Sequence, residues 1–222
     1  MTQQHLDCGA AAADAGLTPM KLEELSQVAK ATAALGGSIL MQHYGQLVSI
    51  RQKARAGDLI TDADLAAEQA VLTGLSEATP EIPVLAEESG AQGDVSELCW
   101  CVDPLDGTTN FAHGYPFFAT SIGLLWRGLP ILGAVAVPFL QEVFWCCPGM
   151  GAFLNDQRIE VSNCSTLEDS LLVTGFAYDR RERLDNNYAE FCRLTHQTRG
   201  VRRGGAAAVD LAYVAAGRLD GY

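Results

Sequence analysis

The chain has 222 residues and a formal net charge of −12, with 27 acidic side chains against 15 lysines and arginines. Nucleic-acid binders cluster Lys and Arg over phosphates, so this charge argues against a nucleic-acid partner, and a small phosphorylated ligand would require a bound cation. Hydrophobic residues make up 48% of the chain, enough for a buried core, and no apolar run is long enough to cross a bilayer. We therefore expect a globular protein with no membrane partner and, without a signal peptide, a cytoplasmic location.

Two helices are predicted in the first third of the chain. Residues 1–18 lack clear signals for the start and end of a helix and are expected to form a loose extension. Apolar residues then recur at helical spacing from Met20 to Tyr44, which predicts an amphipathic helix. Thr61 or Asp62 can cap a second helix, which Pro80 ends.

Short strands dominate the middle of the chain. The runs Pro83–Ala86 and Leu98–Val102 are typical of buried strands, and between Ala119 and Val161 β-rich runs alternate with turn signals, which predicts an antiparallel meander. The remaining predicted elements are a strand at 171–174 and helices at 187–195 and 206–216. This order predicts layered α/β structure. The seven cysteines lack paired C-x2-C spacing and are expected to be reduced thiols.

Acidic residues follow two of the predicted strands directly. Glu87 and Glu88 come after the first, and Asp103 and Asp106 come after the second. Any one of them could be a helix cap or a turn former. Four carboxylates at strand ends, however, raise one another's pKa unless a cation compensates them, and hard oxygen ligands suit magnesium. The cluster therefore predicts a metal site.

The segment that follows Asp106 adds a predicted phosphate cradle. Gly107 allows a sharp turn, and Thr108 stands at a predicted helix start, where free backbone N–H groups can bind phosphate oxygens. A metal site beside a phosphate cradle predicts phosphoryl chemistry.

The segment WCVDPLDGTTNFAH, residues 100–113, resembles the signature of the inositol monophosphatase family. Further matching segments are GDLITDADLAAE at 57–68, AEES at 86–89 and RRGGAAAVDLAYVAAGRLDGY at 202–222. The resemblance implies an αβαβα sandwich and a magnesium-dependent, lithium-sensitive phosphatase that forms a homodimer when full length. It also implies direct in-line attack of a metal-activated water on a small phosphate monoester, without a phosphoenzyme.

Residue by residue, the resemblance implies a metal site and an adjoining substrate site. The implied Mg²⁺ ligands are Glu87, Asp103, the Leu105 carbonyl and Asp106. Glu87 would also help to position the attacking water, which Thr108 would share, with Asp64 hydrogen-bonded to Thr108. Lys53 would lie beside a further, weakly held metal. The implied substrate contacts are Asp106, Gly107 and Thr108 on the phosphate side and Gly205, Ala206 and Ala207 on the alcohol side.

The resemblance leaves the substrate and the activity open. Myo-inositol monophosphate is the leading expectation, and histidinol phosphate, fructose bisphosphate and a nucleotide 3′-phosphate are alternatives. The family pattern continues past Tyr222 with a glutamate and a Trp-Asp pair that this sequence lacks. We therefore expect either an incomplete sequence of a normal enzyme or a truncated, non-catalytic homologue that acts as a binding module. The expected division is the extension at 1–18, an α+β domain with the metal site at 19–165, and an incomplete α/β domain at 166–222.

Overall fold

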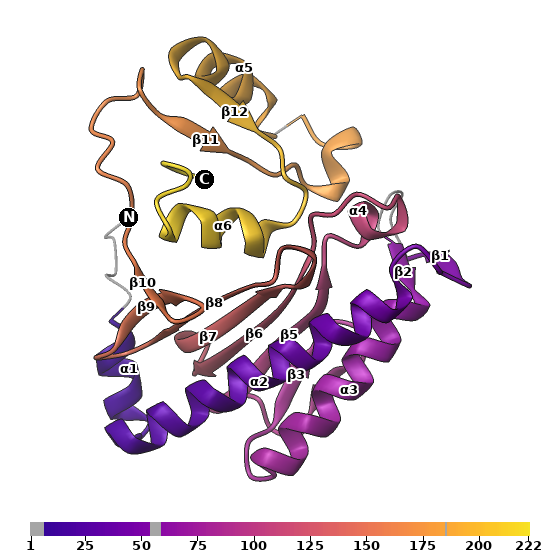
Figure 1. Cartoon of the computed structure of the whole chain (residues 1–222), viewed down its shortest axis with the longest axis vertical. Coiled ribbons are helices and arrows are strands. Elements are labelled where there is room, and N and C mark those ends of the chain that lie inside the picture. The colour runs from indigo at the N-terminus through magenta and orange to yellow at the C-terminus, as the bar shows by residue number, and fades with distance from the viewer. Residues whose placement is uncertain (1–6, 54–58, 185) are drawn as a thin grey trace.

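An eight-stranded sheet in the order β10-β9-β8-β7-β6-β5-β3-β4 forms the centre of the fold (Figure 1). The structure, a computed structural model, describes residues 7–53, 59–184 and 186–222. The strands of this sheet are β3 (Val84–Ala86), β4 (Gly90–Gln92), β5 (Leu98–Asp106), β6 (Ala119–Trp126), β7 (Leu129–Val137), β8 (Glu142–Cys147), β9 (Gly151–Leu154) and β10 (Gln157–Ile159). From β5 to β10 each strand is antiparallel to the next, which confirms the predicted meander, whereas β3 and β5 are parallel.

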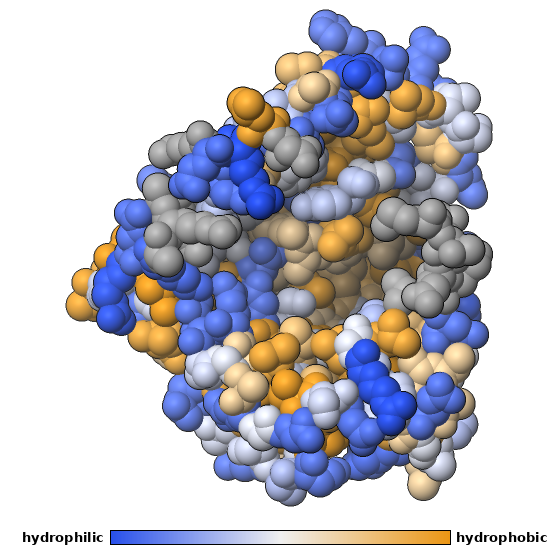
Figure 2. Space-filling view, turned by 180° about the vertical axis from the view of Figure 1, so that it is seen from behind, coloured by the Kyte–Doolittle hydropathy of each residue, from blue (hydrophilic) through white to orange (hydrophobic). Residues whose placement is uncertain are grey.

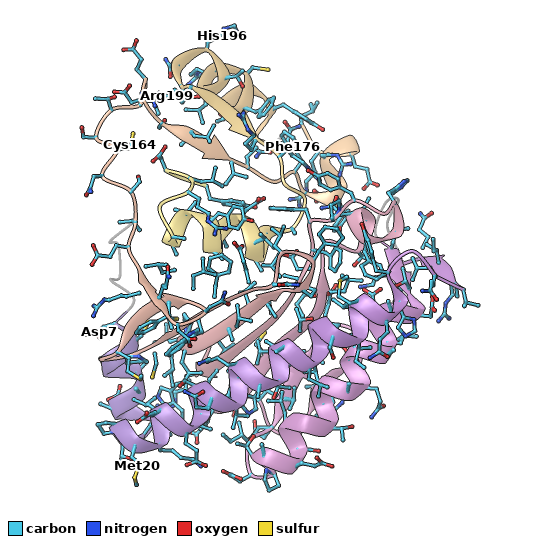
Figure 3. The ribbon with its side chains drawn as sticks, viewed as in Figure 1. Asp7, Met20, Cys164, Phe176, His196 and Arg199 are labelled. Carbon is cyan, nitrogen blue, oxygen red and sulfur yellow. The ribbon has the colours of Figure 1, made fainter. Side chains whose placement is uncertain are left out.

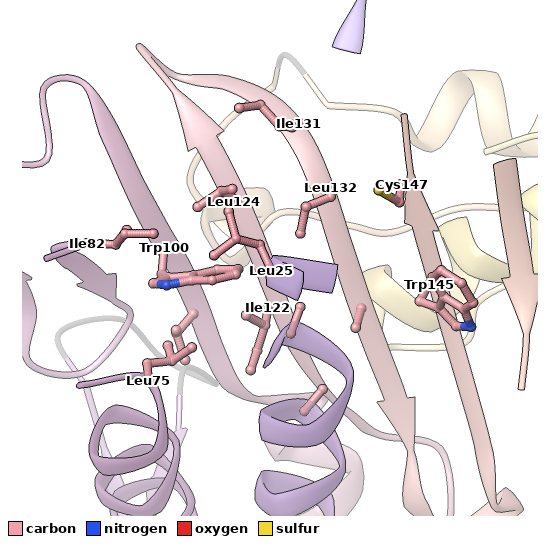
Figure 4. Packing of buried hydrophobic residues seen from close by; sticks show 14 of the residues in the cluster. Leu25, Leu75, Ile82, Trp100, Ile122, Leu124, Ile131, Leu132, Trp145 and Cys147 are labelled. Atoms are coloured by element: carbon pink, nitrogen blue, oxygen red, sulfur yellow. The ribbon is translucent and has the colours of Figure 1, made fainter. Parts of the chain in front are cut away.

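Two long helices, α2 (Pro19–His43) and α3 (Asp62–Ala78), cover one face of the sheet (Figure 1). Thr18 caps α2 through the Lys21 amide, and Pro19 stands at the first helical position, where its missing N–H costs nothing. The side chains of Leu25 on α2, Leu75 on α3 and Trp100 on β5 are fully buried between these layers (Figure 4). Both predicted helices are confirmed, because their apolar stripes face the sheet.

A short helix, α1 (Cys8–Asp14), stands where the sequence predicted a loose extension, so that prediction is wrong for these residues. Asp7 caps it by accepting a hydrogen bond from the Ala10 amide, and Figure 3 marks Asp7 where α1 begins. Ala11 and Ala12 are buried in the core beneath the sheet. The run of alanines has high helix propensity, and its small side chains allow close packing that no punctuation in the sequence signals. Residues 1–6 lie outside the described residues.

A second, smaller layer system lies on the other face of the sheet. The parallel pair β11 (Leu171–Val173) and β12 (Gly200–Arg202) lies between the helices α5 (Tyr188–Gln197) and α6 (Ala207–Ala215), and α6 lies against the large sheet (Figure 1). The layers therefore run α, β, α, β, α, as the sequence resemblance implied. The remaining elements are the hairpin β1 (Ile50–Gln52) and β2 (Leu59–Thr61), the helix α4 (Thr108–Ala112), and the 3-10 turns η1 (Pro138–Leu140) and η2 (Tyr178–Arg181).

An apolar hollow remains between α6 and the large sheet. It has a volume of about 500 Å³, and its walls come from β6 to β10, from Cys8 and from α6. Seen from behind, the molecule is hollowed between its two layer systems, and hydrophobic residues gather there (Figure 2). All seven cysteines are free. Within the described ranges, no helix combines the length and the apolar character that a membrane span requires.

Candidate functional site

The parallel pairing of β3 and β5 brings two of the predicted ligands to one edge of the sheet. Ala86 is paired with Val102, and the Glu87 amide donates a hydrogen bond of 3.0 Å to the Val102 carbonyl. Glu87 and Asp103 therefore leave adjacent strands at the same level. Because parallel strands end on the same side, residues 16 positions apart in sequence contribute carboxylates to one place.

The β5 strand bends immediately after Asp103, where its pairing with β6 shifts register between Asp103 and Asp106. The Leu105 amide donates to Asp103 Oδ1 at 3.1 Å, which holds this bend. Gly107 follows with φ of 95°, and a β-carbon there would lie 3.1 Å from both the Ala206 β-carbon and the Phe117 carbonyl oxygen. Only glycine combines this dihedral angle with this close approach.

Asp106 joins the bend to the start of α6. Its Oδ1 accepts a hydrogen bond from the Ala207 amide at 3.1 Å, and its Oδ2 accepts one from the Ala208 amide at 2.6 Å. Burial raises the pKa of Asp106, and these amides act in the opposite direction. The predicted metal ligand and the predicted alcohol-contacting segment are therefore in direct contact.

Thr108 and Asp64 lie together as the sequence resemblance implied. The Thr108 hydroxyl lies 3.1 Å from Asp64 Oδ1 and 3.0 Å from the Leu105 carbonyl oxygen. Asp64 is itself buried at the start of α3, where its Oδ2 accepts hydrogen bonds from the Thr61 amide and hydroxyl in a capping box. Burial raises the pKa of Asp64 in spite of these hydrogen bonds. The same carboxylate thus caps a helix and orients Thr108.

Asp103 is the electrostatic centre of the cluster. Burial, followed by the negative charges of Glu87 and Asp106, raises the pKa of Asp103 to about 9. In this buried setting the Asp103 carboxylate is costly to ionise unless a cation compensates its charge. The hard oxygen donors and their mutual repulsion fit a magnesium ion.

Lys53 supplies positive charge beside this cluster. Its ammonium group lies 2.9 Å from Glu87 Oε1 and 2.6 Å from Glu88 Oε1. Burial by itself would lower the pKa of Lys53, but the hydrogen bonds and charges of Glu88 and Glu87 raise it above its ordinary value. Among the described residues, no three His, Cys, Asp or Glu side chains are arranged to hold a metal as they stand.

A cavity of about 350 Å³ adjoins the cluster. Asp106, Gly205, Ala206 and Ala207 line it together with aromatic side chains. Ala206 is buried and its neighbours Gly205 and Ala207 are more accessible, so this segment offers backbone groups and small side chains to a ligand. His113, which follows the motif, is exposed on the surface.

Sequence reasoning missed two residues that support the site. The Glu88 amide donates to Glu68 Oε2 at 2.9 Å, so Glu68, buried on α3, holds the segment that carries Glu87. The Asn110 amide group donates to the carbonyls of Phe117 and Gly204, at 2.7 and 3.0 Å. Asn110 lies inside the predicted motif, but its partner Gly204 is 94 residues away, so its role depends on tertiary structure.

Comparisons with known proteins show the family of the chain. A family profile described as "Inositol monophosphatase family" matches residues 21–222. The chain is 50% identical over 206 residues to inositol-1-monophosphatase of Synechocystis sp., covering 92% of this chain and 72% of the relative. It is 36% identical to fructose-1,6-bisphosphatase/inositol-1-monophosphatase of Aquifex aeolicus, covering 90% of this chain and 76% of the relative. The structure of inositol monophosphatase from Anabaena (Nostoc) sp. matches with a TM-score of 0.79 and 48% identity, covering 89% of this chain and 73% of that chain.

Proposed function

Because the chain belongs to the inositol monophosphatase family and is a phosphoric monoester hydrolase, we propose that it hydrolyses a small polyol or sugar phosphate, with myo-inositol monophosphate as the preferred substrate. The observation that carries this proposal is the convergence of Glu87, Asp103 and Asp106 beside the start of α6. Burial of Asp103, together with the charges of Glu87 and Asp106, raises the pKa of Asp103 to about 9, and a carboxylate perturbed in this way supports a site that holds a cation.

We propose Mg²⁺ as that cation, held by the carboxylates of Glu87, Asp103 and Asp106 and by the Leu105 carbonyl. When bound, it would supply Lewis-acid stabilisation of charge on the phosphate and lower the pKa of a coordinated water. The Leu105 carbonyl lies between Asp103 and Asp106 in the sequence and 3.0 Å from the Thr108 hydroxyl, which supports its proposed role as a fourth oxygen ligand.

In this proposal Glu87 and Thr108 position the attacking water for in-line displacement at phosphorus. The Thr108 hydroxyl has one hydrogen, which it directs toward Asp64 or the Leu105 carbonyl. Its oxygen lone pairs are therefore available to accept a hydrogen bond from water. Glu87 accepts the second hydrogen bond of that water, and it is the more accessible of the two glutamates that Lys53 contacts. Orientation by two fixed acceptors lowers the entropic part of the barrier.

The phosphate and the alcohol of the substrate occupy different walls of the site. Backbone N–H groups of Gly107 and Thr108 bind phosphate oxygens, because the first amides of a helix have no partner within it. α4 has only five residues, so these contacts act as individual hydrogen bonds and not through a large helix dipole. Gly205, Ala206 and Ala207 face the alcohol in the cavity of about 350 Å³.

Fructose 1,6-bisphosphate is the second candidate substrate. The Aquifex aeolicus relative is named for activity on both that ester and inositol monophosphate, and it is 36% identical to this chain. Both substrates are polyols with a phosphate monoester, so the same hydrolytic groups serve either one. Discrimination between the two substrates lies in Gly205, Ala206 and Ala207, the segment that faces the alcohol, which we call the alcohol wall.

The test is phosphate release by purified protein with Mg²⁺ from myo-inositol 1-phosphate, fructose 1,6-bisphosphate, histidinol phosphate and a nucleotide 3′-phosphate. In the variant Asp103→Asn, Mg²⁺ affinity measured by calorimetry should fall by at least about 100-fold, because even indirect partners of metal ligands cost 10- to 100-fold. Phosphate release should fall with it. The control Asp156→Asn changes an exposed carboxylate on the β9–β10 turn and should behave as the unaltered protein does.

Two results would contradict the proposal. Undiminished turnover in Asp103→Asn would remove Asp103 from the site. Failure of the unaltered protein to release phosphate from any of the four esters, with Mg²⁺ binding intact, would instead favour a binding module that keeps the fold and the metal.

A further inference from the structure

Asp210 is a buried carboxylate on α6 to which the proposed hydrolysis assigns no part. Its residue is only 2% exposed. Burial and the charge of Asp106 raise the pKa of Asp210 to about 6, while Arg203 and the Gly204 amide act in the opposite direction. A carboxylate withdrawn from water destabilises a fold unless hydrogen bonds compensate it, so its contacts indicate what it does.

One oxygen of Asp210 fits against the backbone of Gly204. The Gly204 amide donates a hydrogen bond to this carboxylate. A β-carbon built on Gly204 would lie 2.1 Å from Asp210 Oδ1 and 2.5 Å from Phe117 Cε1. No side chain fits at Gly204 while Asp210 and Phe117 keep their places, so this position requires glycine.

The carbonyl group of Gly204 is held by Asn110 of α4. The side-chain amide of Asn110 donates to the Gly204 carbonyl at 3.0 Å and to the Phe117 carbonyl at 2.7 Å. Gly204 is thus held at its N–H by α6 and at its carbonyl by α4. Two elements distant in sequence fix the path of the chain at this residue.

The clamped residue leads directly into the alcohol wall. Gly205 follows with φ of 88°, and its carbonyl oxygen lies 3.4 Å from the position that a β-carbon on Gly107 would occupy. Ala206 and Ala207 come next, and the Ala207 amide binds Asp106. A shift at Gly204 would therefore move the alcohol wall.

The second carboxylate oxygen of Asp210, Oδ2, is unpaired within the described part of the chain. Among the side chains that the structure describes, Asp210 Oδ2 is the buried polar atom that has no hydrogen-bond partner. Asp210 contributes to the wall of the same cavity as Asp106 and Gly205. Buried polar atoms are nearly always paired, so an unpaired carboxylate oxygen beside a ligand cavity points to a role in the site.

We infer that Asp210 is a positioning residue that sets the preference for the alcohol part of the substrate, by fixing the Gly204–Gly205 turn from which Ala206 and Ala207 project. The inference rests on the proposed phosphatase function. The relevant ligand class is a polyol or sugar whose hydroxyl groups need a precisely placed wall. A leaving group without such hydroxyls, such as p-nitrophenol, makes no hydrogen bonds that depend on the position of this wall.

The experiment compares two esters, myo-inositol 1-phosphate and p-nitrophenyl phosphate, in the full chain with Mg²⁺. In Asp210→Ala, kcat/KM for the inositol ester should fall about 10- to 100-fold, and that for the nitrophenyl ester less than about threefold, because misplacing a wall by about 1 Å costs up to 100-fold. Asp210→Asn keeps Oδ1 as an acceptor for the Gly204 amide and should restore the ratio of the two values. Gly204→Ala should reproduce the effect of Asp210→Ala, because its β-carbon displaces Oδ1.

Val209→Ala is the matched control. Val209 is fully buried on the same helix and packs into the core between α6 and the sheet, so its truncation loosens α6 without touching Gly204. The ratio of the two kcat/KM values should stay unchanged. Three results would each overturn the inference. They are a ratio in Val209→Ala that shifts as much as in Asp210→Ala, a ratio in Asp210→Ala equal to that of the unaltered protein, and a ratio in Asp210→Asn that falls as it does in Asp210→Ala.

Hydrogen exchange separates this inference from the proposed function. The backbone amides of Gly204 and Gly205 should exchange about tenfold faster in Asp210→Ala than in the unaltered protein, since each lost hydrogen bond opens the turn locally. Asp210→Asn should exchange at the unaltered rate. If no ester is hydrolysed by the unaltered protein, the proposed function fails, and unchanged exchange in Asp210→Ala would independently overturn the positioning role.

Discussion

Asp62 shows how one side chain links three parts of the structure outside the site. Its Oδ1 accepts hydrogen bonds from the Ser49 amide at 3.0 Å and the Val48 amide at 3.3 Å, and its Oδ2 lies 3.4 Å from His43 Nδ1. These contacts join the end of α2, the segment before β1 and the start of α3. Burial acts to raise the pKa of Asp62, but the backbone hydrogen bonds from Ser49 and Val48 and the contact with His43 lower it overall.

The lowered pKa predicts a pH-dependent contribution to stability. A carboxylate with a depressed folded-state pKa stabilises the fold above its unfolded pKa of about 3.9 and loses that contribution as the pH falls through the folded value. The difference in unfolding free energy between the unaltered protein and Asp62→Asn, measured by urea titration, should therefore have its full value at pH values above the unfolded pKa and shrink as the pH falls below it through the lower folded-state pKa. Asp156→Asn controls for the loss of one surface charge. A difference that stays constant over this range would show that Asp62 acts by shape alone.

At the scale of elements, the close approach of α2 to the sheet and to α3 depends on Gly36. A β-carbon at Gly36 would lie 2.7 Å from Thr120 Cγ2 on β6 and 2.9 Å from Val71 Cγ2 on α3. Thr120 is fully buried and donates to the Pro104 carbonyl at 2.9 Å, so it has little freedom to move. A glycine that is unfavourable for an isolated helix thus allows three elements to meet.

Two glycine-to-alanine variants should consequently have opposite effects on stability. Gly36→Ala should lower the free energy of unfolding by about 1–3 kcal/mol, because it overpacks a rigid contact. Gly74→Ala, in the middle of α3, should raise it by roughly 0.5–1 kcal/mol, because alanine is the better helix former. There the new β-carbon would lie 3.5 Å from Thr32 Cγ2, which is ordinary contact. Urea unfolding of both variants would test the pair, and stabilisation by Gly36→Ala would refute this account of the packing.

The elements also show where sequence patterns were sufficient. The caps and apolar spacing of α2 and α3 predicted both helices because these signals are local, and the antiparallel strands followed from alternation and turn residues. The helix α1 was missed because its alanine-rich sequence carries no periodic pattern, and its burial beneath the sheet supplies the stability that local signals do not.

At the scale of the whole molecule, the hollow between α6 and the large sheet is the main departure from close packing. Leu211 is 52% exposed at its rim, while the sheet side consists of residues such as Ile131 and Ala134. Figure 2 shows hydrophobic residues within the hollow on this side of the molecule. Apolar surface of this extent attracts apolar ligands.

The dye ANS, which binds exposed apolar surface, should therefore fluoresce with the folded protein. Leu211→Glu places a charge at the rim and should weaken the signal with little change in unfolding free energy, because the residue is half exposed. Met20→Glu is the control, since Met20 is 79% exposed at the start of α2, far from the hollow (Figure 3). Equal fluorescence for Leu211→Glu and the unaltered protein would place the dye elsewhere.

The sequence by itself determined the class of the protein: the order of helices and strands, the acidic motif after two strands, and a family resemblance carried by contiguous segments. These features are local, so hydrophobic period, caps and turn residues encode them directly. Only the tertiary structure decided which groups meet. The parallel pairing of β3 with β5 sets Glu87 beside Asp103, and Lys53 holds Glu87 at 2.9 Å. Contacts such as Asn110 with Gly204 span 94 residues, and no local pattern specifies a distance between segments that far apart.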